Sequence, residues 1–266
     1  LFAAGAGVLA LAALPFLPQS YYERMATITQ PGGDESASTR VAVWRWTQTT
    51  ESDRFVLAAC EGATLDVGCG PGFFSIMLSR LGHRVTSLDA SEGMLRAARR
   101  NLTWYGIEPH VRHGDVVTLD GVADSSVDAV VSRDVVWTLH DPAAAYRRWF
   151  QVLRPGGLVL VYDGNYRTDR TGVRHSIWKA LSNGLIMLTE GRRSGHARDD
   201  GSDPTANLPS RHRERPATDV PLLRKAGFMG VTTEPDRYRM SRRHLGYWKY
   251  AHQGEKFIIE AHKPSQ

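Results

Sequence analysis

Cysteine is scarce in this sequence of 266 residues, and that scarcity limits what the chain can contain. Cys60 and Cys69 stand nine positions apart, with no histidine or further cysteine beside them at metal-ligand spacing. Two cysteines cannot build a disulfide framework, and this arrangement does not predict a zinc site. We therefore expect no metal, and we take the low cysteine usage to fit a reducing compartment such as the cytoplasm.

A hydrophobic run long enough to cross a membrane is also missing. The segment LFAAGAGVLALAALPFLP, residues 1–18, is apolar and uncharged. It is shorter than the ~20 residues that a spanning helix needs, Pro15 interrupts it, and no basic region precedes it as in a signal peptide. Three interpretations stay open: an anchor remnant, an apolar helix packed on the domain, or an extension before a start at Met25. Membrane association through residues 1–17 is thus considered but not favoured.

Strong charge of one sign is absent as well. The formal net charge is only +5, with an isoelectric point near 9.4. No basic run is interleaved with aromatic residues at stacking positions, as a nucleic-acid surface would require. We interpret the excess as a basic surface or as steering of an anionic ligand, and we do not expect nucleic acid as a partner.

What the chain does contain is an alternation of short apolar runs and amphipathic segments. It predicts a parallel sheet with helices on both faces, whose ligands bind beyond the carboxyl ends of the strands. The expected strands are 63–67, 83–90, 110–115, 156–165, 230–236 and 255–263, together with 126–136 as a strand that runs into a loop. The expected helices are 40–60, 73–82, 91–101, 141–153, 175–190 and 220–228, with Ser91 as an N-cap and Pro142 in a first turn.

This alternation also divides the chain into five expected regions. They are an extension or helix over 1–24, a helical cap over 25–62, a ligand-binding core over 63–165, a lid or insertion over 166–217, and a completion of the sheet over 218–266. Residues 191–217 are polar and rich in helix breakers. A solvated loop and a lid are equally good interpretations of this segment.

The stretch TLDVGCGPGFFS places three glycines behind an acid that ends an apolar run. Gly68 and Gly70 permit backbone angles that a Cβ would block, and Gly72 allows close helix packing. The dinucleotide pattern needs a sixth-position glycine, where this chain has Phe73. Asp66, two residues before the first glycine, would be a poor neighbour for a pyrophosphate. These features favour a ligand with an ammonium group and no phosphates.

LDVGCGPG resembles the first motif of class I S-adenosylmethionine-dependent methyltransferases. VTSLDAS, HGDV and LRPGGLVLVYD resemble later family segments in order and spacing, over about residues 63–165. The resemblance implies an α/β fold with a Rossmann-like doubly wound sheet, mostly parallel with an antiparallel last strand and helices on both faces. It implies S-adenosylmethionine as the cofactor and methyl transfer as the activity.

Carried over by position, the resemblance implies roles for residues of the four segments. The glycines bring backbone close to the methionine part of the cofactor, Asp66 orients their loop or the amino group, and Asp89 takes the ribose hydroxyls. Met94 packs on the adenine, although a core role is the alternative, and Asp115 accepts from the adenine amine. The complete implied cofactor set is Asp66, Gly68, Cys69, Gly70, Gly72, Asp89, Ala90, Met94, Gly114, Asp115, Val116, Ser132 and Arg133.

The family has no fixed catalytic residue, because methyl transfer from a sulfonium needs mainly positioning and desolvation. In SRDVVWTLHDP, Asp134 and His140 are candidate catalytic groups. The alternative for Asp134 is contact with the ammonium group of the cofactor, and the alternative for His140 is a locally bonded helix-start residue. The candidate acceptor-pocket residues, for which core packing is the alternative at Trp137, are Tyr21, Tyr22, Trp137, Tyr166 and His175.

These residues favour a small organic acceptor with an aromatic or anionic part, methylated on O, N or C. We expect the enzyme to be a monomer or a homodimer. The alternatives are a nucleic-acid or protein methyltransferase, a cofactor-binding scaffold without turnover, and a membrane-linked enzyme acting on a lipid or quinone. No NPPY-type tetrad follows the fourth strand, which argues against the nucleic-acid option.

Overall fold

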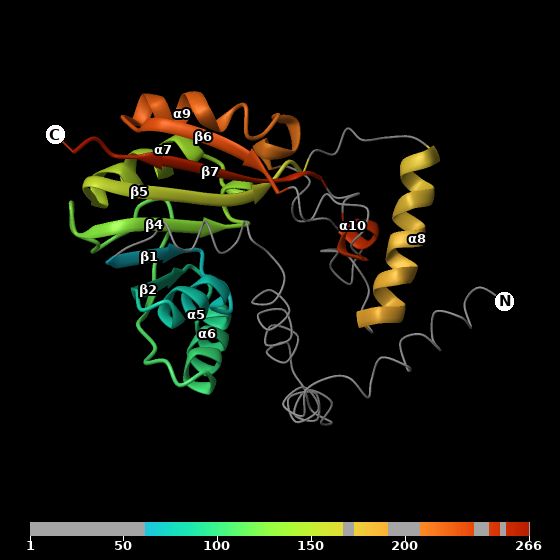
Figure 1. The fold of residues 1–266 in the computed structure, drawn as a ribbon, viewed down its shortest axis with the longest axis horizontal. Coiled ribbons are helices and arrows are strands. Elements are labelled where there is room, and N and C mark those ends of the chain that lie inside the picture. The colour runs from blue at the N-terminus through green and yellow to red at the C-terminus, as the bar shows by residue number, and fades with distance from the viewer. Residues whose placement is uncertain (1–61, 167–172, 191–207, 237–244, 251–253, 266) are drawn as a thin grey trace. The chain divides into compact units, whose positions relative to one another are not determined.

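A computed structural model of the protein describes residues 62–166, 173–190, 208–236, 245–250 and 254–265 (Figure 1). The helix expected over 40–60, the regions 1–24 and 25–61, and the candidates Tyr21 and Tyr22 lie outside these residues. No helix in the described ranges is both long enough and apolar enough to span a membrane.

The described elements alternate as the sequence predicts. The strands are β1 (Ala63–Val67), β2 (Arg84–Asp89), β3 (Val111–His113), β4 (Val127–Arg133), β5 (Leu153–Gly164), β6 (Met229–Pro235) and β7 (Lys256–His262). The α-helices are α5 (Phe73–Arg80), α6 (Glu92–Trp104), α7 (Pro142–Val152), α8 (Val173–Glu190), α9 (Asp219–Ala226) and α10 (Leu245–Tyr250). Two short 3-10 helices are η2 (Val136–Thr138) and η3 (Pro209–His212).

The seven strands form one sheet in the order β3-β2-β1-β4-β5-β7-β6. β1 to β5 are mutually parallel, while β7 runs antiparallel to both β5 and β6. The chain leaves β1 toward β2 and β3 and then returns to the other side of β1 with β4. The edge between β1 and β4 is therefore a topological switch point, where such sheets bind ligands. The expected fold class, including the antiparallel last strand, is confirmed.

Helices cover both faces of the sheet, with α5 and α6 on one face and α7 and α9 on the other (Figure 1). The main core lies under α7 and α9, where Tyr146 and Trp149 are completely buried against strand residues such as Val130 and Val161. Burial of aromatic side chains of this size dominates core energetics. This layer holds the carboxyl ends of the central strands in fixed register.

Most helices begin within one or two residues of the positions that the capping residues predicted. The Ser91 side chain accepts a hydrogen bond from the Met94 N–H at 3.4 Å and so caps α6, as expected. Pro142 opens α7, whose N-cap Asp141 accepts from Ala144. α5 ends before Gly82, which adopts φ +92°. Capping chemistry of this kind is contained in a few consecutive residues.

Several strand boundaries differ from the expected ones. In the segment 126–136, expected as a strand that runs into a loop, β4 ends at Arg133, because Asp134 adopts φ +55° and turns the chain out of the sheet. β3 keeps only three residues, and β5 starts at Leu153, ahead of the Pro155-Gly156-Gly157 turn. The helix α10 was not expected from the sequence.

Candidate active site

The loop after β1 has the left-handed backbone that its glycines predict. Gly68, Gly70 and Gly72 adopt φ values of +68°, +53° and +88°. A Cβ on Gly68 would lie 2.3 Å from Val135, and one on Gly72 would lie 3.4 Å from Ala98. A Cβ on Gly70, in contrast, would meet nothing within 4 Å. Packing against Val135 requires the first glycine, whereas the second lines open space, and the positive φ of all three favours glycine.

Asp89, the last residue of β2, fastens this loop. Its Oδ2 accepts a hydrogen bond from the Gly70 N–H at 2.8 Å, and its Oδ1 accepts from the Ser91 N–H at 2.8 Å. Each carboxylate oxygen has a second lone pair that remains available for a hydroxyl donor. Met94, in the first turn of α6, is 41% exposed. The end of β2 and the start of α6 therefore provide a carboxylate that can accept from hydroxyls, on Asp89, and an exposed thioether, on Met94.

The loop after β3 is tied to the same place. The Gly114 N–H donates to the Asp89 carbonyl at 3.1 Å, and the His113 ring lies 3.0 Å from the Ala90 carbonyl. Asp115 Oδ1 accepts from the Val117 N–H at 2.6 Å. In addition, the Val116 carbonyl accepts from Trp149 Nε1 at 2.8 Å. The expected cofactor residues of three strands thus meet at one edge of the sheet.

Two of the expected cofactor residues turn their side chains into the protein. Asp66 is 1% exposed and accepts a hydrogen bond from Ser75 Oγ at 2.6 Å, while Ser87 Oγ donates to Ser75. Burial raises the pKa of Asp66 to about 6. Burial likewise raises the pKa of the Cys69 thiol, which packs against Leu95. For Asp66, this geometry supports the loop-orienting alternative, because its carboxylate holds α5 behind the glycines.

Ser132 and Arg133 end β4 on opposite faces of the sheet. Ser132 pairs in register with Val67, is completely buried, and its Oγ has no hydrogen-bond partner among the described residues. The Arg133 guanidinium lies 4.3 Å from the centre of the Phe73 ring, which directly follows the glycine loop. Arg133 is therefore in contact with the segment that forms the candidate cofactor site.

Asp134 stands at the centre of a polar cluster that the sequence only partly indicated. Its Oδ1 accepts from the Tyr166 hydroxyl at 2.6 Å and from Lys256 Nζ, which also donates to the Tyr166 oxygen. Burial by itself would raise the pKa of Asp134, but the charges of Lys256 and Arg133 outweigh it and hold the pKa at about 2. Asp134 is consequently an anion over the physiological range and a weak base.

Trp137 lies beside this cluster. Its Nε1 donates to the Asp134 carbonyl at 2.8 Å, and its ring centre is 4.8 Å from that of Tyr166. The Trp137 N–H donates to Asp163 Oδ2 at 3.0 Å. Arg215, which is 4% exposed, bonds the same Asp163 oxygen at 2.7 Å. A buried ion pair therefore supports the loop that carries Trp137 and Asp134.

Asp219 completes that buried network, because it accepts from Arg215 Nε at 2.8 Å and from the Tyr146 hydroxyl at 2.6 Å. Sequence reasoning missed Lys256, Asp163, Arg215 and this acid. Asp163 could have been noted as an acid at the end of a strand, as Asp89 was. Nothing local marks Lys256, whose position depends on the pairing of Gly164 with the first residue of β7.

Two other candidates are not joined to the cluster by any described contact. His140 is exposed between η2 and α7, and none of the described hydrogen bonds involves its ring. His175 belongs to α8, but its side chain lies outside what the structure describes. Their expected roles stay predictions.

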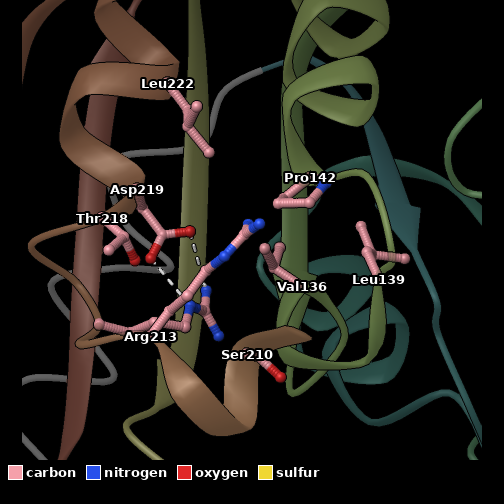
Figure 2. Close-up of a pocket in the computed structure, with 9 residues that line it drawn as sticks. Val136, Leu139, Pro142, Ser210, Arg213, Thr218, Asp219 and Leu222 are labelled. Atoms are coloured by element: carbon pink, nitrogen blue, oxygen red, sulfur yellow. Dashed lines mark hydrogen bonds and ion pairs between the residues drawn. The ribbon is translucent and has the colours of Figure 1, made fainter. Parts of the chain in front are cut away.

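A small cavity lies away from the glycine loop, between the η2–α7 segment and the η3–α9 segment (Figure 2). Val136 and Leu139 line it from the η2–α7 side, and Ser210, Asp219 and Leu222 line it from the η3–α9 side (Figure 2). None of its lining residues belongs to β1, β2 or their loops. The cavity is therefore a gap between the supporting elements rather than the candidate cofactor site.

Comparison with known proteins agrees with this geometry. Residues 65–161 match the family model described as a methyltransferase domain. A ubiquinone biosynthesis O-methyltransferase from Ruegeria pomeroyi is 38% identical over 96 residues, which are 36% of this chain and 38% of that protein. A malonyl-[acyl-carrier protein] O-methyltransferase from Serratia marcescens is also 38% identical over 96 residues, 36% of each chain. The chain thus matches well under half the length of these relatives.

A solved structure of an S-adenosylmethionine-dependent methyltransferase from Methanosarcina mazei superposes with a TM-score of 0.54 at 20% identity. It covers 77% of this chain and 93% of that one, and at this identity it shows the shared fold alone. The sheet order and the ligand-binding edge define a Rossmann-like α/β domain. Within that class, residues 65–161 match the family model of a methyltransferase domain, and the resemblance inferred from the sequence is confirmed.

Proposed function

We propose that this chain transfers a methyl group from S-adenosylmethionine to a small organic acceptor by in-line displacement. The observation that carries the proposal is the glycine loop with open space over Gly70, next to the Asp89 carboxylate at the switch point of the sheet. The matched family model and the O-methyltransferase relatives support the same activity.

The residues present fit this cofactor. Asp89 would hold the ribose hydroxyls, Met94 would lie against the adenine, and the Asp115 loop would accept from the adenine amine. The loop from Gly68 to Gly72 contains no lysine or arginine, which suits a ligand without phosphates. When bound, the cofactor supplies an activated methyl group on a sulfonium. The glycine loop would position it, and the side chains that end β4 would exclude water from it.

Proton removal is needed only when the acceptor atom carries a proton. Asp134 was expected as a catalytic group, but a carboxylate whose pKa is held at about 2 accepts protons poorly at neutral pH. We assign Asp134 the role of holding Lys256 and Tyr166 in place. His140 stays the candidate base, because histidine is the side chain that most often serves as a general base.

The partners we propose are a small-molecule acceptor and no nucleic acid, in the cytoplasm. The low cysteine usage and the absence of a basic, aromatic-interleaved run support this proposal. The match to small-molecule O-methyltransferases supports it too.

The first test is calorimetric titration of the apo protein with S-adenosylmethionine and S-adenosylhomocysteine. We expect binding to weaken by about 10- to 100-fold in Asp89→Ala, since hydrogen bonds to a charged group contribute about 1.5–3 kcal/mol each. Glu108→Ala, an exposed acid on the loop before β3, is the matched control and should bind as the wild type does. Thermal unfolding of both variants separates lost contacts from lost structure. Absence of binding by folded wild type would refute the proposal.

A further inference from the structure

Two cations meet on one carboxylate where β4 ends. Lys256 Nζ donates to Asp134 Oδ1, and Arg133 Nε lies 3.9 Å from Asp134 Oδ2. The three side chains are 11%, 26% and 32% exposed for Lys256, Arg133 and Asp134, respectively. They are thus partly shielded from water yet still reachable, and charges in such surroundings interact more strongly than fully hydrated ones.

Aromatic rings border both cations. The Tyr162 ring centre lies 6.0 Å from the Arg133 guanidinium carbon and 5.6 Å from Lys256 Nζ. The Tyr166 ring adds a second face, 4.6 Å from Lys256 Nζ, and Trp137 packs on Tyr166. Cations held over ring faces beside flat apolar surfaces suit a planar molecule that carries negative charge.

This cluster extends along the carboxyl ends of the strands, from the candidate cofactor site to the start of β7. Arg133 stacks on Phe73, the first residue after the glycine loop. Lys256 begins β7 opposite Gly164, the last residue of β5. Because ligands of such sheets lie beyond the carboxyl ends of the strands, an acceptor approaching the transferred methyl group would pass this cluster.

We propose that Lys256 and Arg133 bind the anionic group of the acceptor, and that the acceptor is a small aromatic acid. The carboxylate of that acid lies toward Lys256 Nζ and the Arg133 guanidinium, and its ring lies against Tyr166 and Trp137. Asp134 fixes the two cations in position. This inference rests on the proposed methyltransferase function and names the substrate class of the same site.

The alternative role for the cluster is structural, namely a latch between β7 and the end of β4. A latch would affect unfolding but would not distinguish an acid from its amide. The test therefore compares matched ligands rather than stability. We choose 4-hydroxybenzoate, 3,4-dihydroxybenzoate and salicylate, each against the corresponding amide, which keeps the shape and removes the charge.

The experiment is calorimetric titration of the full chain saturated with S-adenosylhomocysteine. We expect at least one acid to bind the wild type about 10- to 100-fold more tightly than its amide. Lys256→Met should abolish that preference, and Lys256→Arg should restore part of it. Lys225→Met, the same change at an exposed position of α9, should leave the preference intact.

Two results would overturn the inference while leaving the proposed function standing. One is S-adenosylhomocysteine binding with no acid preferred over its amide. The other is an acid preference that survives in Lys256→Met. Failure of S-adenosylhomocysteine to bind the wild type would instead overturn the proposed function, and this inference with it. Thermal unfolding shows whether each variant folds. If Lys256→Met does not fold, Tyr166→Phe disrupts the same cluster and replaces it in the test.

Discussion

Asp66 makes the stability of the apo protein depend on pH in a way that can be calculated. Its carboxyl is 1% exposed, between β1 and α5, and burial raises its pKa from 3.8 to about 6 in the folded protein. As the pH rises, the unfolded chain loses this proton first, and unfolding becomes progressively more favourable. The stabilisation is therefore fully present below pH 3.8 and is lost as the pH rises through about 6.

The size of this effect follows from the shift. About two pH units at 1.36 kcal/mol each correspond to about 3 kcal/mol, a sizeable part of the ~5–15 kcal/mol that stabilises a typical domain. Asp66→Asn keeps the shape and can still accept from Ser75 Oγ, but it does not ionise. We therefore expect the free energy of unfolding of Asp66→Asn to gain about 2.5 kcal/mol over that of the wild type between pH 4 and pH 7.5.

Urea unfolding of the apo protein across this range measures the difference directly. Subtracting the two curves cancels the titration of the other groups, which both proteins share. Glu108→Gln, an exposed acid, controls for the loss of one charge and should follow the wild type. A wild-type and Asp66→Asn difference that does not change with pH would refute the reasoning, since Asp66 would then titrate alike in the folded and unfolded chains.

Two further predictions concern the buried ion pairs and the glycine loop. Arg215→Met leaves Asp163 and Asp219 buried without their cation, and it should lower the free energy of unfolding in urea by about 3–5 kcal/mol. Arg224→Met, at an exposed position of α9, should lower it little. Equal losses in the two variants would contradict the network. Gly70→Ala and Gly82→Ala both place a Cβ at positive φ in open space, so their costs in stability should be similar. Calorimetry should show weaker S-adenosylmethionine binding only for Gly70→Ala; unchanged binding would exclude the space over Gly70 as the cofactor site.

The cofactor half of the molecule was predictable because its signals are local. The left-handed loop after β1, the Ser91 cap and the Pro142 helix start each depend on a few consecutive residues, whose allowed backbone angles and capping bonds are intrinsic to them. Asp89 was placed correctly at the end of β2. The alternation of strands and helices then fixed a mainly parallel sheet with its ligand edge after β1.

The direction in which a side chain points could not be read from the sequence alone. The sequence left open whether Asp66 orients the glycine loop or the amino group of the cofactor, and in the structure its carboxylate lies between β1 and α5 and accepts a hydrogen bond from Ser75. Likewise, the sequence did not show that Lys256 and Arg133 hold the pKa of Asp134 at about 2. In both cases the pKa depends on burial and on charges brought from other elements.

The amino-acid sequence by itself determined the fold class, the glycine loop and the methyltransferase resemblance, because each depends on short-range spacing and backbone preference. Only the tertiary structure brought Lys256 to Asp134, across 122 positions, and Arg215 to Asp163, across 52. Those contacts depend on β7 pairing antiparallel between β5 and β6, and on α9 packing on α7. Such pairings are decided by which packed arrangement of all the elements has the lowest free energy, and no local pattern of residues encodes that choice.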